Sequence, residues 1–99
     1  MEEIKKVGFD LEVSDEVGQG IYSNLAIIAH SASEFIIDFA SVMPAIPKSK
    51  VRSRIILTPE HAKRLYLSLQ ENIARYEAAF GKIEIPQRTG GFNGKIGQA

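Results

Sequence analysis

The sequence has no cysteine and no tryptophan among its 99 residues. Without cysteine, the chain has no disulfide framework, no thiolate metal site and no cysteine nucleophile. It also lacks any apolar run approaching the roughly 18 residues that a membrane span needs, and the segment from Met1 to Lys6 is charged rather than apolar. We therefore expect a cytoplasmic protein that does not enter a membrane.

Motifs of catalysis and metal binding are also lacking. No serine lies in a nucleophile-elbow pattern, and no GxxxxGK[ST] run is present to cradle a phosphate. The two histidines, His30 and His61, are separated by a spacing that matches no metal motif. We predict no catalytic, cofactor-binding or metal site, and a protein that is not an enzyme.

Neither positive nor negative charge is in excess, because twelve basic and twelve acidic residues give a formal net charge of zero. This balance disfavours a dedicated nucleic-acid binder. The charges are nevertheless unevenly spread. Residues 1–16 carry six acids and two bases, residues 17–47 carry two acids, and residues 48–99 carry ten bases and four acids. An acidic sheet face beside a basic helix and loops is the simplest explanation.

The stretch from Thr58 to Phe80 has an unambiguous helical period. Thr58 is a good N-cap residue, Pro59 suits the first helical position, and Gly81 is a typical stop. Apolar residues recur within an arc of roughly 100°, forming a stripe of Ala62, Leu65, Tyr66, Leu69, Ile73, Tyr76 and Phe80. The sequence predicts a helix over residues 59–80 that needs an apolar surface to pack on.

Four β-strands are predicted before this helix. The strand at residues 6–13 alternates apolar and polar side chains, the strands at 21–30 and 34–42 are apolar on both faces, and the fourth spans 51–57. The connections are short, which favours antiparallel neighbours, with Ser31-Ala32-Ser33 as a tight reversal. We predict an α+β fold, a two-layer sandwich in which a four-stranded antiparallel meander is covered on one face by the helix.

Residues 1–81 are expected to form a single domain, since a chain of this length builds one modest core. Residues 82–99 end in TGGFNGKIGQA, which has four glycines in eleven residues. That composition favours a mobile tail.

One helix covers only one face of such a sheet. Apolar side chains on the other face would meet water, and a patch of that kind usually marks an interface. We place on this face Tyr22, Ala26, Ile28, Ile36, Val42 and Ile56. The sequence therefore predicts a homodimer, or a surface for a partner protein, and a self-associating protein-interaction domain such as a small scaffold or chaperone-like binder.

Asp38 interrupts an apolar strand. A carboxylate in such a place needs a nearby cation or takes a raised pKa. Arg52 or Arg54 on the fourth strand is the candidate partner, and we predict a structural ion pair between Asp38 and Arg54.

A basic ridge is the second charged feature of these strands. Lys48, Lys50, Arg52 and Arg54 alternate with other residues, so in a regular strand all four would point to one side. Such a ridge either protects a sheet edge against unwanted pairing or binds an anionic partner. The alternative function is therefore a nucleic-acid-binding module.

Residues 20–80 resemble a family of small bacterial and archaeal proteins, a domain of unknown function of similar length. The most specific parts are Glu34-Phe35 with Asp38-Phe39, and the run Thr58-Pro59-Glu60-His61-Ala62-Lys63. This resemblance implies no activity. A looser similarity, of topology alone, is to the export chaperone SecB, which also has four antiparallel strands followed by a long helix and self-associates.

Overall fold

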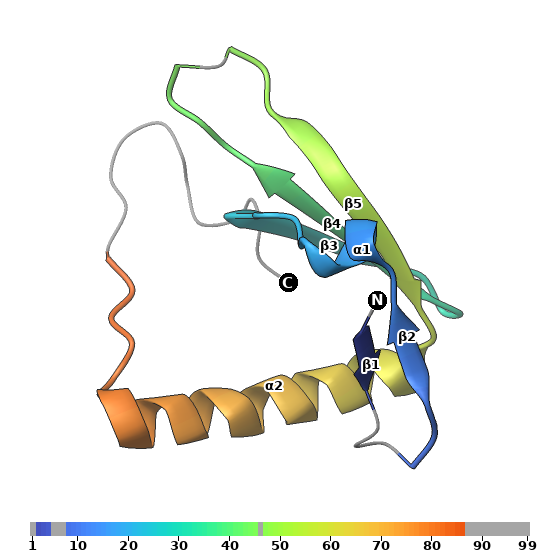
Figure 1. Ribbon diagram of the computed structural model, residues 1–99. Coiled ribbons are helices and arrows are strands. Elements are labelled where there is room, and N and C mark those ends of the chain that lie inside the picture. Colours follow the sequence, from blue (N-terminus) through green and yellow to red (C-terminus); the bar gives the residue numbers. More distant parts are fainter. Residues whose placement is uncertain (1, 5–7, 46, 87–99) are drawn as a thin grey trace.

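The structure, a computed structural model, describes residues 2–4, 8–45 and 47–86. In order, the elements are β1 (Glu2–Ile4), β2 (Leu11–Val13), α1 (Asp15–Gly18), β3 (Leu25–His30), β4 (Phe35–Ser41), β5 (Lys50–Leu57) and α2 (Pro59–Phe80) (Figure 1). Strands β3, β4 and β5 form an antiparallel sheet in that order, and β1 and β2 form a separate antiparallel pair. The predicted α+β class, with an antiparallel sheet followed by a long helix, is confirmed.

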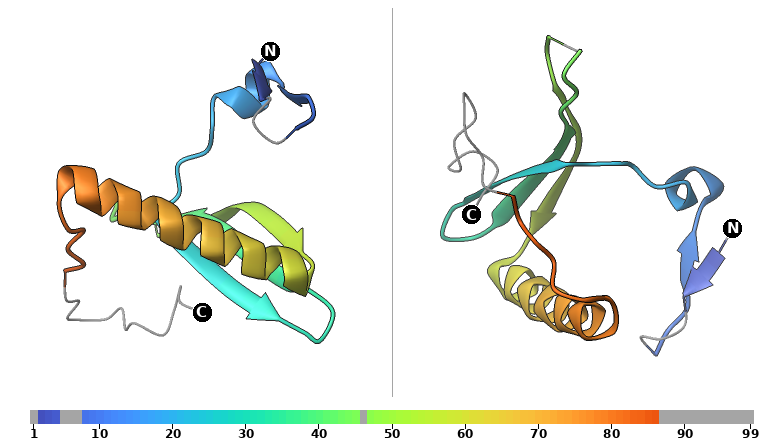
Figure 2. Two further views of the ribbon diagram at one scale, coloured as in Figure 1. Left: turned by 90° about the horizontal axis from the view of Figure 1, so that it is seen from below. Right: turned by 90° about the vertical axis from the view of Figure 1, so that its left-hand side faces the viewer.

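The predicted fourth strand of the meander is wrong. Within the strand expected at residues 6–13, the structure has β2, which pairs with β1 rather than with β3. Residues 6 and 7 lie outside the described residues. The part of the expected mobile tail from residue 87 onward lies outside them as well. Pairing with β1 needs only the connection 5–10, whereas α1 and a linker separate β2 from β3. The unit made of β1, β2 and α1 stands apart from the sheet (Figure 2).

A two-residue turn sets the register of β3 against β4. The Ser31 N–H donates to the Glu34 carbonyl at 2.9 Å, which leaves Ala32 and Ser33 as the turn. The predicted three-residue reversal would have shifted the pairing by one residue, and such a slip moves every side chain to the other face. The positions of these strands along the sequence were therefore predicted well, but the prediction of which residues of β3 and β4 lie on the same face of the sheet was wrong.

Because paired residues share a face and successive residues alternate, the register defines two sides of the sheet. The inner face carries Ala26, Ile28, His30, Phe35, Ile37, Phe39, Ser41, Lys50, Ser53, Ile55 and Leu57. The outer face carries Leu25, Ile27, Ala29, Ile36, Asp38, Ala40, Val51, Arg54 and Ile56. The inner face is the one turned toward α2, since Phe35 and the first turns of α2 line a common hollow.

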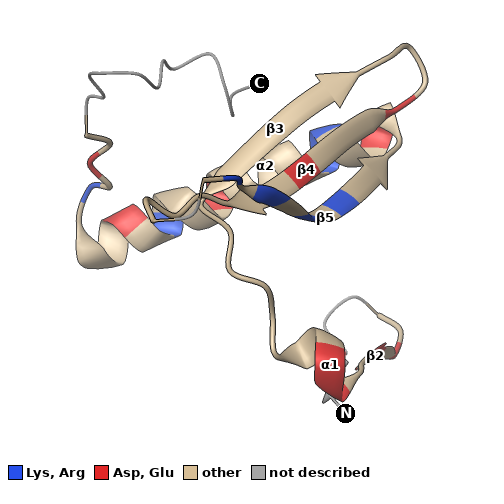
Figure 3. Ribbon diagram, turned by 90° about the horizontal axis from the view of Figure 1, so that it is seen from above, with Lys and Arg blue, Asp and Glu red and all other residues tan. Residues whose placement is uncertain are grey.

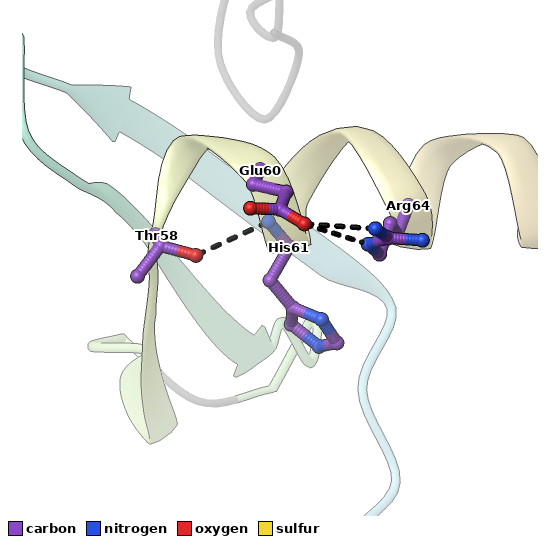
Figure 4. A network of polar contacts seen from close by, with 4 residues as sticks. All are labelled: Thr58, Glu60, His61 and Arg64. Atoms are coloured by element: carbon purple, nitrogen blue, oxygen red, sulfur yellow. Dashed lines mark hydrogen bonds and ion pairs between the residues drawn. The ribbon is translucent and has the colours of Figure 1, made fainter. Parts of the chain in front are cut away.

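Helix α2 begins directly after β5, with one residue between them. The Thr58 Oγ1 accepts a hydrogen bond from the His61 N–H at 3.1 Å, and Glu60 pairs with Arg64 at 2.8 Å on the exposed surface (Figure 4). Gly81, with φ of 100°, ends the helix and donates its N–H to the Glu77 carbonyl. The observed bounds match the predicted helix because cap, proline and glycine are all local signals.

Few of the described side chains are buried. Among the described side chains only Ile37 and Ala40 are buried, at 9% and 5% exposure, and no residue of α2 is buried. The radius of gyration is 16.2 Å, against about 13 Å for a compact domain of this length. From Thr58, α2 and the sheet diverge like the arms of a V (Figures 1 and 2). The predicted sandwich is therefore open within one chain.

Replacing Thr58 tests the cap at this junction. We expect Thr58→Ala to lower the free energy of unfolding by about 0.5–2 kcal/mol, because the His61 N–H loses its acceptor. Urea unfolding followed by circular dichroism at matched protein concentration measures the change. Thr58→Ser keeps the acceptor and serves as the control. Equal stability of Thr58→Ala and the parent would show that this cap does not stabilise α2.

Candidate functional site

The apolar stripe of α2 faces the inner side of the sheet but meets it at one end only. Pro59, Ala62 and Tyr66 line a hollow of about 360 Å³ together with Phe35. Beyond Tyr66 the helix moves away from the sheet. The remaining large apolar side chains of the stripe are Leu69, Ile73, Tyr76 and Phe80, exposed by 55%, 40%, 50% and 76%. The stripe is thus an uncovered apolar surface.

The inner face of the sheet is the second apolar surface, and most of its side chains are half-buried, with Ile55 exposed by 44%. Of its residues in the three strands, only Lys50 at the start of β5 is a charged Asp, Glu, Lys or Arg. The His30 ring stacks on Phe35, with ring centroids 5.3 Å apart. A hollow of about 1110 Å³ lies along the rest of this face, lined among others by Val17, Ile21, Ala26, Phe39 and Ile55. The stripe and the inner face together form the apolar clamp of the chain.

The outer face differs because it holds an ion pair at its centre. Arg54 Nε and Nη2 donate to Asp38 Oδ1 and Oδ2 at 2.7 and 2.8 Å, in the bidentate geometry expected of a strong pair. Figure 3 shows an acidic position in β4 beside basic positions in the neighbouring strand β5. The hydrogen bonds from Arg54 lower the pKa of Asp38, and the positive charge of Arg54 adds to this effect, against the opposing effect of desolvation. The pair predicted from the sequence is present, and it keeps charge on the side of the sheet away from α2.

The set expected on one uncovered face comprised Tyr22, Ala26, Ile28, Ile36, Val42 and Ile56. The register separates its members. The two from β3 lie on the inner face, whereas Ile36 and Ile56 are paired on the outer face, and the other two lie outside the strands. Their role in an interface stays a prediction, but they do not form a single patch.

Side-chain hydrogen bonds missed by sequence reasoning fix how the chain enters β3. The Asn24 amide donates to the Val42 carbonyl and accepts from the Val42 N–H, at 3.0 and 2.8 Å. The Ser41 hydroxyl donates to the Tyr22 carbonyl at 2.7 Å. Asn24 therefore completes the ladder where the backbone pairing of β3 and β4 ends.

The expected basic ridge from Lys48 to Arg54 is interrupted. The pairing of β4 with β5 shifts between Phe39 and Ala40, which leaves Arg52 as an extra residue in β5. Alternation along β5 changes sides there, so Lys50 and Arg54 lie on opposite faces. The four bases do not form one row, and Arg54 is engaged by Asp38. Binding of an anionic partner by this segment stays a prediction.

In the part of the chain that the structure describes, neither helix is long and apolar enough to cross a membrane. Nor do three or more His, Cys, Asp or Glu side chains gather there as a metal site would require.

The ion pair makes stability depend on acid pH. Because the pKa of folded Asp38 is lowered, its contribution is full above the unfolded value of about 3.9 and is lost as the pH falls through the folded value. We expect Asp38→Asn to lack this part of the acid-induced loss of stability, whereas Asp10→Asn, an exposed control, keeps it. Urea unfolding at several pH values between about 5 and 2 measures this. Parallel pH profiles for Asp38→Asn and the parent would contradict the assignment.

Comparison with known proteins identifies the family but no activity. Residues 1–85 match the family described as "Protein of unknown function (DUF3467)". No curated protein and no solved structure matches the chain, so no comparison shows a likeness to SecB. The resemblance to a family of unknown function is confirmed. With the match spanning most of its length, the chain belongs to the DUF3467 family of proteins of unknown function.

Proposed function

We propose that this protein is a self-associating protein-interaction domain that works as a homodimer and has a binding rather than a catalytic role. The observation that carries the proposal is the uncovered stripe of α2. Each of its six large apolar side chains is at least 40% exposed in the single chain. A contiguous apolar surface of this kind usually marks an interaction site.

The energetics of α2 support a covering partner. Six large apolar side chains left in water forgo on the order of 10 kcal/mol of burial. In a single chain only the first turns of α2 line a hollow with the sheet, so most of this burial is not realised. A stable α2 therefore needs another apolar surface along most of its length.

The exposed area is large enough for a dimer. The accessible surface of the chain is 8891 Å², against about 5600 Å² for a compact protein of this mass. A standard interface buries about 800 Å² from each partner. The excess, which is summed over the whole chain and not over the clamp alone, is larger than that requirement.

A second copy of the chain can cover the apolar clamp, because each chain carries both an apolar helix face and an apolar sheet face. In the dimer these surfaces would complete the two-layer sandwich that one chain leaves open. The zero formal net charge of the chain sets up little repulsion between identical copies. A scaffold or chaperone-like role of the resulting dimer is part of this proposal.

Light scattering after size-exclusion chromatography tests the association. At micromolar concentration we expect twice the chain mass of 10.9 kDa. Ile73→Glu places a charge in the stripe and is expected to give the monomer mass. Ala78→Glu is the matched control, because Ala78 lies about 140° around the helix from Ile73, and it should keep the dimer mass. A clean monomer for the parent chain would overturn the proposal.

A further inference from the structure

We infer that the dimer is reciprocal: α2 of each copy lies on the inner face of the partner's sheet. The inference rests on the proposed function and specifies which surfaces meet. It commits to a second copy of this chain as the occupant of the apolar clamp.

The junction between β5 and α2 prevents the helix from closing on its own sheet. Thr58 alone separates the two elements, its side chain caps the helix, and Pro59 has a fixed φ. Laying α2 flat against its own inner face would require breaking the cap or the end of β5. The first turns of the helix of the same chain line a hollow with Phe35 at one end of the inner face.

Among the symmetric pairings of two copies, the reciprocal one covers the most apolar surface. Packing stripe against stripe leaves both inner faces exposed, and packing inner face against inner face leaves both stripes exposed. Placing each helix on the partner's sheet covers all four surfaces. It also closes under a twofold axis, which is the commonest symmetry of soluble dimers.

The dimensions of the two surfaces agree. The uncovered part of α2, residues 67–80, is about 21 Å long at 1.5 Å per residue. The seven residues of β4 span about 24 Å, and three strands are about 14 Å wide, which matches the diameter of one helix. The hollow of about 1110 Å³ lies along the open part of the inner face, bordered by Ala26, Phe39 and Ile55.

The charge distribution selects the inner rather than the outer face. A helix stripe without charged residues packs best on a surface that is also uncharged. The charged residue that the register places on the inner face is Lys50, at the start of β5 and far from Phe35, whereas the Asp38–Arg54 pair occupies the middle of the outer face. Burying that pair under a helix would remove both charges from water at a cost in free energy.

Cross-linking between chains tests the arrangement, and the absence of native cysteine makes each introduced thiol unique. Two variants, Ile73→Cys in the stripe and Ile28→Cys on the inner face, are purified with different tags, mixed in denaturant and refolded together. A short bis-maleimide then joins thiols that lie close together. Any link in this mixture is between chains, because each chain carries a single thiol, and a link that joins the two different variants is called the mixed link. Light scattering on the untreated mixture confirms that it is dimeric.

The reciprocal dimer predicts that the mixed link forms several-fold more than either self-link. Two controls should lower the yield of the mixed link several-fold. Ala78→Cys, on the opposite side of α2, replaces Ile73→Cys. Ala29→Cys replaces Ile28→Cys, since Ala29 follows Ile28 in β3 and lies on the outer face. Leu69→Cys and Ala26→Cys provide a second pair of test positions if either first variant fails to fold.

The other outcomes separate this inference from the proposed function. Predominant links between two Ile73→Cys chains, or between two Ile28→Cys chains, in a dimeric sample would overturn the reciprocal arrangement and leave self-association standing. If the parent and every variant have the monomer mass, and no variant is cross-linked, both the reciprocal arrangement and the proposed self-association are overturned.

Discussion

The constraint on which the rest of the structure depends is the one-residue junction at Thr58. It fixes the direction in which α2 leaves β5, through a cap bond to the His61 N–H and the restricted backbone of Pro59. The helix is aimed along its own sheet but diverges from it after Tyr66. An apolar helix face and an apolar sheet face are thus held open toward each other, and among the described side chains of a single chain only Ile37 and Ala40 are buried.

The two faces of the sheet differ in where their charged residues lie, and they therefore suit different surroundings. The bidentate pair of Asp38 and Arg54 holds β4 and β5 together on the outer face and suits contact with water. The inner face carries a charge only at Lys50, at the start of β5, and the rest of it is the natural surface for a second apolar layer. In the proposed dimer, the arrangement of charges favours contact through the inner side of the sheet and leaves the outer side facing solvent.

Much of this fold could be predicted from the sequence where the signals are local. The bounds of α2 follow from Thr58, Pro59 and Gly81, and the ion pair follows from one acid placed among apolar residues beside a basic strand. Register could not be predicted, because it depends on whether two or three residues turn between β3 and β4, and that choice moved Ile36 to the opposite face from Ile28. Nor does amphipathicity say whose surface a helix covers. The pairing of β2 with β1 is local, but β1 has only three residues, too few for a pattern to indicate a strand.

The most direct test of the account is the dependence of thermal unfolding on protein concentration. If folding requires two chains to cover each other's apolar surfaces, mass action makes the melting temperature rise steadily over about a hundredfold range of concentration. A melting temperature that stays constant across this range, with cooperative unfolding of a monomer, would contradict the claim that a second copy completes the core.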